Sequence, residues 1–310
     1  MATAFASFCW TWSARLPNTR RANPSTTTSQ CSPSHTGEIE LPGIGVGAGV
    51  KIFSEVMKFR SVYRVRSSEM TPECLLKDYY VGMYFQECFA EYAAARKCAA
   101  YDIAADSLTW LTVEGGVEFF PPMPFWRSPV EVSVWLYKIG AVRMRTNFEA
   151  HCDGRRIARG YSVNLMADLK THRPQRSAVV AEKFETCAEE VFPEAESVCK
   201  MDIPDGAPVV GRLVQTVRFD DLDFNMHLNN VRYIPRALEA LDLDYRLAHS
   251  LKSYRIKFER EARFGDEIES VAAGGDGAFS HLLRRVSDGA ALCAMRTFWQ
   301  PNAAAERGKP

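Results

Sequence analysis

The sequence predicts an α+β protein made of two tandem repeats, in each of which an antiparallel sheet wraps around one long helix. Two observations support this prediction. In several segments every second residue is apolar, which is the pattern of half-buried antiparallel strands. These segments follow a helical segment, and the same layout occurs twice along the chain. Because antiparallel strands can bury a single helix only if their sheet curls around it, the two units are expected to share one extended sheet.

The first repeat is expected to cover residues 56–185. It begins with the strand-like segment Val62–Arg66, followed by a helix from about Pro72 to Ala99. The apolar residues of this helix cover most of its circumference, which is typical of a buried helix. The strands that follow are predicted at Val130–Leu136, Val142–Phe148 and Ile157–Leu165, with a hairpin turn at Asp153-Gly154 before the last one.

The second repeat is expected to cover residues 205–302, and the charged, proline-containing segment 170–205 leads into it. It begins with a strand at Val214–Phe219 and continues with a helix from roughly Val231 to Leu243. The later strands are predicted at Tyr254–Phe258, Ile268–Ala272, Phe279–Val286 and Ala290–Phe298, with a turn at Asp288-Gly289 between the last two. Setting Tyr84 against Tyr233 aligns the two repeats.

Composition excludes several classes of function. The chain has 310 residues, a formal net charge of zero, 46% hydrophobic residues and 25% charged residues, as is typical of a soluble globular protein. The balanced charge gives no basic field that would indicate a nucleic-acid partner. No run of about 18 apolar residues exists, so no membrane span is expected. Nine cysteines occur without a CxxC pair, and neither a metal site nor a disulfide framework is indicated. The glycine-rich segment Gly43–Gly49 follows no strand, so no cofactor is expected there.

The N-terminal 55 residues have the composition of a leader and linker. Residues 1–37 contain no Asp or Glu, but they carry three arginines and many serines and threonines. An acid-free leader that is rich in Ser and Arg is typical of an organelle transit peptide, which predicts a plastid location. An ordinary tail could have the same composition, and the protein would then be cytoplasmic.

Polar residues that could carry chemistry concentrate before the second predicted helix. Asp223, Asn225 and His227 alternate with other residues, and in an extended chain this spacing places all three on one side. An Asn amide and the free N–H groups of a helix N-terminus can polarise a carbonyl and stabilise an oxyanion. His227 can move protons near neutral pH, and Asp223 can fix the orientation of either neighbour. A capping loop favours the same residue types, so both interpretations remain open from the spacing alone.

Glu261 is the second candidate for chemistry. In the predicted strand Tyr254, Ile256 and Phe258 face inward, and strict alternation would turn Glu261 outward. A local irregularity is therefore needed to bring this carboxylate into a site. Without that irregularity, Glu261 is a solvated charge beside two arginines.

The run from Asp221 to Ile234 resembles the plant and bacterial acyl-acyl-carrier-protein thioesterases, a double hotdog family. The family pattern is Asp-Leu-Asp-x-Asn-x-His-Val-Asn-Asn, then a basic or polar residue, Tyr and Ile, and this chain reads Asp-Leu-Asp-Phe-Asn-Met-His-Leu-Asn-Asn-Val-Arg-Tyr-Ile. The run Phe258–Glu261 corresponds to an aromatic-Arg-Arg-Glu run in the family. The layout of helices and strands also agrees from about residue 59 to residue 300.

This resemblance implies hydrolysis of the thioester between a fatty acid and acyl carrier protein, which ends fatty acid synthesis. The implied partners are the acylated carrier protein and the fatty acyl chain, and the formation of a homodimer is left open. The implied catalytic residues are Asp223, Asn225, His227 and Glu261. Asn225 and His227 would position and polarise the thioester, and Glu261 would act as a general base or as a nucleophile.

The resemblance implies a binding role, without catalytic residues, for the first repeat. In the alignment through Tyr84 and Tyr233, Cys74, Leu76 and Asp78 stand opposite Asp223, Asn225 and His227. The first repeat would therefore have lost the chemistry and would hold the acyl chain, as it does in the family.

Two departures from the family pattern keep alternatives open. Ala262 stands where many relatives have a Cys, and Pro235-Arg236 replaces a common Gly-Trp. A proline inside a helix bends it unless it lies near the start. One alternative is a catalytically impaired double hotdog that binds acyl chains or carrier protein, and another is an acyl-CoA thioesterase. A hotdog dehydratase also uses a His and a carboxylate, but it would not need the Asp-x-Asn-x-His run.

Overall fold

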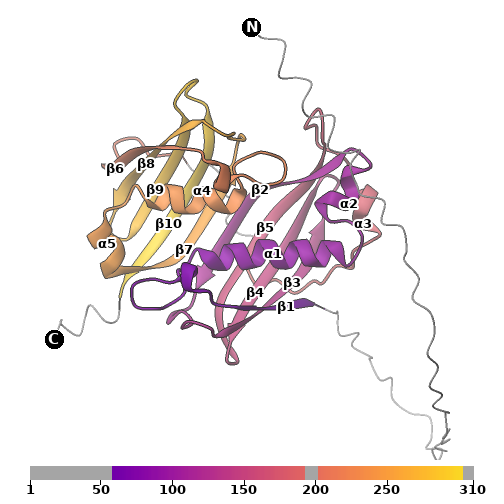
Figure 1. Ribbon diagram of the computed structural model, residues 1–310, viewed down its shortest axis with the longest axis horizontal. Helices are drawn as coiled ribbons and strands as arrows, with labels where there is room; N and C mark the ends of the chain where they lie inside the picture. The colour runs from indigo at the N-terminus through magenta and orange to yellow at the C-terminus, as the bar shows by residue number, and fades with distance from the viewer. Residues whose placement is uncertain (1–57, 193–201, 303–310) are drawn as a thin grey trace, which may run out of the picture. The chain divides into compact units, whose positions relative to one another are not determined.

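The protein is described by a computed structural model that covers residues 58–192 and 202–302 (Figure 1). The predicted leader and linker, residues 1–55, lie outside the described residues. The strands in the described ranges are β1 (Phe59–Arg64), β2 (Leu108–Phe119), β3 (Pro129–Ile139), β4 (Arg143–Cys152), β5 (Arg155–Asp168), β6 (Val209–Thr216), β7 (His249–Phe258), β8 (Glu267–Gly275), β9 (Ala278–Arg285) and β10 (Ala291–Pro301). No helix in these ranges is long and apolar enough to cross a membrane.

All ten of these strands belong to one antiparallel sheet in the order β1-β3-β4-β5-β2-β7-β10-β9-β8-β6. The order of the second half mirrors that of the first, because β6, β7, β8, β9 and β10 take the places of β1, β2, β3, β4 and β5. The two halves join where β2 pairs with β7, with Glu114 opposite Lys257 and Glu118 opposite Ser253. The prediction of an α+β fold with two repeats that share one extended sheet is confirmed.

One helix of each repeat lies against the same face of the sheet, as Figure 1 shows for α1 (Tyr80–Ala94) and α4 (Asn230–Leu238). Buried side chains from both helices and both halves of the sheet form one continuous hydrophobic cluster. Short helices occupy the connections, namely α2 (Ala100–Ala104), α3 (Ala178–Ala181), α5 (Leu243–Ala248) and the 3₁₀ turns η1 (Ser67–Glu69) and η2 (Phe219–Asp221).

The predicted helix boundaries were wrong in both repeats. The first helix begins at Tyr80 and not near Pro72, because residues 71–79 form a loop in which Cys74 has a φ of 63°. The second helix ends at Leu238, so it is short. Asp242 then starts a separate helix, α5, by accepting hydrogen bonds from the N–H groups of Asp244 (2.8 Å) and Tyr245 (3.3 Å).

Strand β2 was not predicted, although it is central to the sheet. It pairs with β5 on one side and β7 on the other, and its register against β5 shifts between Thr112 and Glu114, which interrupts the alternation of apolar and polar residues. A glycine pair within it is required by close packing. A Cβ atom on Gly116 would lie 2.8 Å from the Tyr161 ring and 3.2 Å from the Tyr254 carbonyl oxygen.

Hydrogen bonds in the loop before each helix fix how the repeats correspond. The N–H of Asp223 donates to the His227 carbonyl (2.8 Å), and the N–H of Thr71 donates to the Leu75 carbonyl (2.8 Å). Met226 has a φ of 62°, which matches the φ of Cys74 in the first loop. The predicted alignment of Tyr84 with Tyr233, and of Cys74, Leu76 and Asp78 with the second-repeat motif, is therefore wrong.

The correct counterparts of Asp223, Asn225 and His227 are Thr71, Glu73 and Leu75. A match between two tyrosines misled the alignment, whereas the hydrogen bonds of the turn determine the register. The first repeat still lacks the asparagine and the histidine of the second, although it keeps the same backbone loop.

A buried histidine connects the end of α4 to the sheet. The His281 side chain lies 3.1 Å from the Ala237 carbonyl oxygen through Nδ1 and 2.9 Å from Thr297 Oγ1 through Nε2. A carbonyl can only accept, so Nδ1 carries the proton and Nε2 accepts from the Thr297 hydroxyl. Trp299 Nε1 donates to the same hydroxyl oxygen at 3.0 Å. The neutral ring satisfies every member of this network, and burial lowers the pKa of His281 to about 4.

Stability is therefore expected to fall as pH decreases from 6.5 to 4. In this window the unfolded chain binds a proton at His281 and the folded protein does not, so up to about 3 kcal/mol of unfolding free energy is lost. Gln has a donor and an acceptor but does not titrate. His281→Gln is expected to make urea-unfolding free energies less dependent on pH in this window, and an unchanged dependence would contradict this account of His281.

Candidate active site

The loop between η2 and α4 is held in shape by its own aspartate. Asp223 Oδ1 accepts hydrogen bonds from the N–H groups of Asn225 (2.8 Å) and His227 (3.2 Å), and the N–H of Met226 donates to the Asp223 carbonyl (3.0 Å). The three predicted residues thus lie together through a tight turn, and the expected extended backbone is absent from this loop. At its end Asn229 caps α4 by accepting from the N–H of Val231 (3.2 Å).

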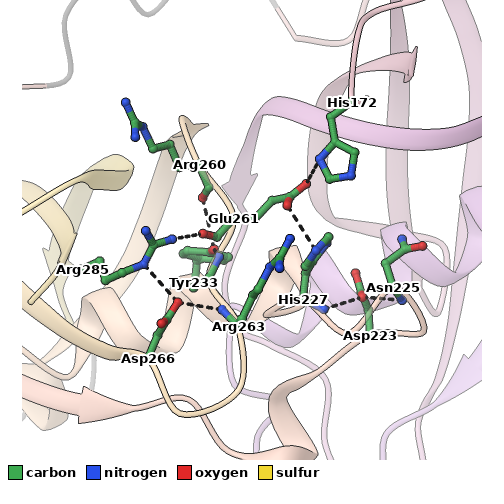
Figure 2. Close-up of polar contacts among 11 residues, drawn as sticks. His172, Asp223, Asn225, His227, Tyr233, Arg260, Glu261, Arg263, Asp266 and Arg285 are labelled. Carbon is green, nitrogen blue, oxygen red and sulfur yellow. Dashed lines mark hydrogen bonds and ion pairs between the residues drawn. The ribbon is translucent and has the colours of Figure 1, made fainter. Parts of the chain in front are cut away.

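The irregularity that Glu261 needs is present after β7. Strand β7 ends at Phe258, and the N–H groups of Glu259 (2.8 Å) and Arg260 (3.2 Å) both donate to the Leu292 carbonyl. Two donors on one acceptor mark a bulge, which breaks the alternation of the strand. The Glu261 backbone is then held by Arg285, which donates to the Glu261 carbonyl at 2.6 Å. Figure 2 shows the Glu261 carboxylate turned toward His227.

These residues line a cavity of about 810 Å³ at the junction of the two repeats. The second repeat contributes Asp223, Asn225, His227 and Glu261 to the lining, together with Asn230 at the start of α4. The first repeat contributes Trp110–Val113 of β2, where the pairing with β5 shifts register between Thr112 and Glu114. A cavity of this size with a few convergent polar groups is typical of a small-molecule or substrate site.

Two imidazole rings hold the Glu261 carboxylate. His227 Nε2 lies 3.2 Å from Oε2, and His172 Nδ1 lies 3.1 Å from Oε1 (Figure 2). Burial lowers the pKa of His227 below its ordinary value, although the Glu261 and Asp223 carboxylates oppose this shift. Burial also raises the pKa of the Asp223 carboxyl, against the hydrogen bonds from His227 and Asn225. His227 is consequently a neutral ring near pH 7, with Nε2–H donated to Glu261.

His172 was missed in the sequence, although it also lines the cavity. It lies in a turn after β5 in which Asp168 Oδ1 accepts from the N–H groups of Lys170 (3.1 Å) and Thr171 (2.7 Å). The sequence signals a turn here only through Asp168, since an Asp side chain favours turns by accepting hydrogen bonds from N–H groups two or three residues on. Nothing local indicates that the turn reaches a glutamate far along the chain.

The unusual Pro235-Arg236 pair belongs to the support of the site. Pro235 lies inside α4, and the Arg236 side chain is buried behind the loop. Its guanidinium contacts Asp221 Oδ2 at 2.5 Å and also donates to Gln215 Oε1 (3.1 Å) and the Thr216 carbonyl (3.2 Å). Since Asp221 starts the loop that carries Asp223, this ion pair anchors the candidate site to β6.

Position 262, where the resemblance implied a cysteine, faces the core. The Ala262 side chain is fully buried and is not part of the cavity lining. The Ala262 N–H donates to the Tyr233 hydroxyl (3.1 Å), and its carbonyl accepts from the N–H of Leu228 (2.8 Å). The backbone at this position joins the two loops of the site, whichever side chain it carries.

Ala262→Cys is therefore expected to change the rate of a reaction in this cavity by no more than about threefold. The added sulfur atom in a packed core is expected to lower stability by roughly 1–3 kcal/mol. Steady-state kinetics and inactivation by a thiol reagent test this expectation. A tenfold gain in kcat, or a new sensitivity of activity to the reagent, would show that the introduced thiol reaches the substrate.

Known proteins resemble this chain in sequence and in fold. Residues 212–301 match the family model of the acyl-ACP thioesterase C-terminal domain. The chain is 31% identical over 195 residues to a chloroplastic palmitoyl-acyl carrier protein thioesterase of Arabidopsis thaliana. This aligned region covers 57% of this chain and 46% of that protein. It is 29% identical over 198 residues to the chloroplastic acyl-[acyl-carrier-protein] hydrolase FATB1 of Cuphea viscosissima, and the aligned region covers 60% of this chain and 46% of that protein. The chain thus spans about half the length of these curated relatives.

Solved structures share the arrangement of strands and helices. The 12:0-ACP thioesterase from Umbellularia californica superposes with a TM-score of 0.70 at 21% identity, over 79% of this chain and 98% of that one. An acyl-ACP thioesterase from Bacteroides thetaiotaomicron superposes with a TM-score of 0.65 at 20% identity, over 78% and 97%. These likenesses establish the double hotdog fold. The sequence match in the second repeat is to the C-terminal domain of the acyl-ACP thioesterases.

Proposed function

We propose that the protein hydrolyses the thioester of a fatty acid with acyl carrier protein and releases the free acid, which terminates fatty acid synthesis. The observation that supports this most strongly is the cavity at the repeat junction, where Asn225, His227 and Glu261 converge. The relatives named above are thioesterases and hydrolases of acyl-acyl carrier protein, which favours the carrier-bound substrate over acyl-CoA.

In the proposed reaction Glu261 acts as the general base. It takes a proton from water as the water oxygen bonds to the thioester carbon, and the carbonyl becomes an oxyanion. The Asn225 amide and the N-terminal end of α4, whose first residue Asn230 lines the cavity, stabilise that charge. When the C–S bond breaks, Glu261 returns its proton to the departing thiolate, so the products are a fatty acid and the free carrier thiol.

His227 and Asp223 prepare this arrangement. The neutral His227 ring donates to Glu261, which keeps the carboxylate beside the cavity, and the Asp223 turn fixes the backbone of both Asn225 and His227. Preorganised donors of this kind are most effective where bulk water is excluded and the geometry is fixed before the reaction.

The first repeat is proposed to hold the acyl chain within residues 56–185. Its loop keeps the backbone of the second-repeat loop but carries Thr71, Glu73 and Leu75, so it lacks the asparagine and the imidazole. Strand β2 of this repeat lines the cavity through Trp110 and its neighbours, which offers apolar surface directly beside the reacting carbonyl.

A direct test is the release of free thiol by the purified full-length protein. Acyl-carrier-protein and acyl-CoA thioesters of several chain lengths are supplied at equal concentration, and thiol is followed spectroscopically. Release is expected, and kcat/KM is expected to be higher for the carrier-bound substrates. Release from acyl-CoA alone would replace the proposed substrate, and no release from any thioester would leave a protein that only binds acyl chains or carrier protein.

We further propose that residues 1–55 direct the protein to the plastid stroma. The support is the acid-free, Ser- and Arg-rich composition of this segment and the chloroplastic relatives. A fluorescent fusion of residues 1–55 is expected to accumulate inside plastids of a plant cell. A diffuse cytosolic signal would contradict this location.

A further inference from the structure

His172 lies at the end of a turn that the local sequence builds. Its N–H donates to the Asp168 carbonyl (2.8 Å), and the Asp168 N–H donates to the Arg173 carbonyl (3.0 Å). His172 adopts a φ of 54°, in the left-handed region that Gly, Asn, Asp and His occupy more readily than other residues. The turn fixes the backbone of His172 independently of Glu261.

The side chain reaches from this turn to the carboxylate of Glu261. His172 Nδ1 is 3.1 Å from Oε1, while the second oxygen is 3.2 Å from His227 Nε2. The two rings meet edge to face, with 6.0 Å between their centroids. Each carboxylate oxygen thus has its own imidazole donor, one from the turn after β5 in the first repeat and one from the second repeat (Figure 2).

Glu261 needs such a partner because its side chain is not confined by packing. It has a relative exposure of 31% and carries its carboxylate on rotatable bonds, while only its backbone is fixed by Arg285. A single contact with His227 would leave the carboxylate free to turn about that contact. A second donor on the other oxygen fixes the plane of the group and hence the direction of its remaining lone pairs.

We infer that His172 is a positioning residue for Glu261, which makes the proposed base an assembly of both halves of the chain. This inference rests on the proposed hydrolysis. His172 Nδ1 carries the proton, because an ionised carboxylate can only accept. The ring does not touch the reacting atoms, and its effect is to hold the base in the orientation that accepts a proton from water.

Two substitutions that both tolerate a positive φ test the contact in the full-length protein. His172→Gly removes the side chain, and His172→Asn places an amide N–H near the position of Nδ1. We expect His172→Gly to lower kcat by about 10- to 100-fold with KM changed less than about threefold, since one charge-assisted hydrogen bond is lost. We expect His172→Asn to retain kcat within about threefold of the wild type. Equal kcat in the wild type and His172→Gly, or equal losses in the two variants, would overturn the inference.

A spectroscopic readout tests the same contact without activity. Nitrogen-15 NMR of the imidazoles is expected to show His172 protonated at Nδ1 in the wild type and to show loss of that preference in Glu261→Ala. A His172 tautomer that is unaffected by Glu261→Ala would overturn the contact. Absence of thiol release by the wild type would instead overturn the proposed function, so the two failures are distinguishable.

Discussion

Replacement of Glu261 by Gln is expected to lower kcat for acyl thioester hydrolysis by about 10²- to 10⁴-fold, the range that a positioned general base contributes. Gln has nearly the same shape and can still accept a hydrogen bond from His227 Nε2, but it cannot take a proton from water. KM and the free energy of unfolding should change little, since the carboxylate is partly exposed and its backbone contact with Arg285 is retained.

The same substitution has a second expected effect, on His227. The Glu261 carboxylate raises the pKa of His227 against the lowering effect of burial, so its removal should lower that pKa further. Proton NMR titration of His227 measures this shift. Glu267→Gln is the matched control, because Glu267 is an exposed glutamate of β8 outside the cavity. Full activity in Glu261→Gln, or an equal loss in Glu267→Gln, would contradict the assignment of the base.

Arg236→Leu is expected to give the largest loss of stability, roughly 3 kcal/mol in urea unfolding at pH 7. The substitution leaves the Asp221 carboxylate without its guanidinium partner and removes donors to Gln215 and the Thr216 carbonyl. This value is at the lower end of the range of about 3–5 kcal/mol for buried pairs, because Asp221 keeps 20% of its side chain exposed. Activity should also fall, since the Asp221 carbonyl accepts from the N–H of Asn229, the cap of α4.

The first repeat provides the control for this prediction. At the corresponding positions Tyr84 donates its hydroxyl to Glu69 Oε2 at 2.5 Å, and both residues are buried. Asp221→Glu combined with Arg236→Tyr installs this neutral-to-charged pair in the second repeat. The double variant is expected to be more stable than Arg236→Leu. Wild-type stability in Arg236→Leu would show that the ion pair does not anchor the loop.

The sequence predicted the repeated layout because strand periodicity and the paired turns are local signals. The hairpins at Asp153-Gly154 and Asp288-Gly289 were recognised from residue type alone. Strand β2 was missed for the opposite reason. A register shift against β5 between Thr112 and Glu114 interrupts its alternation, and Gly115-Gly116 weakens its strand propensity.

The site residues also divide into those that local sequence reveals and those that only the folded structure reveals. Asp223, Asn225 and His227 were recognisable because one short loop carries all three. Glu261 reaches the site only through the bulge in which the N–H groups of Glu259 and Arg260 share the Leu292 carbonyl of β10. Strict alternation of the strand pattern does not predict this bulge. His172 and Arg236 depend on partners distant in the chain, and only the folded structure brings those together. The register between the repeats was predicted wrongly because two tyrosines look alike, whereas the turn at Cys74 and Met226 is a property of the backbone.

The most direct test of the proposed site is thiol release from acyl-carrier-protein thioester in single turnover by the wild type, His227→Ala, Glu261→Ala and the double variant. Because His227 acts through its contact with Glu261, the double variant is expected to lose about as much rate as Glu261→Ala alone. Release by the wild type that persists in the double variant would contradict the site described here.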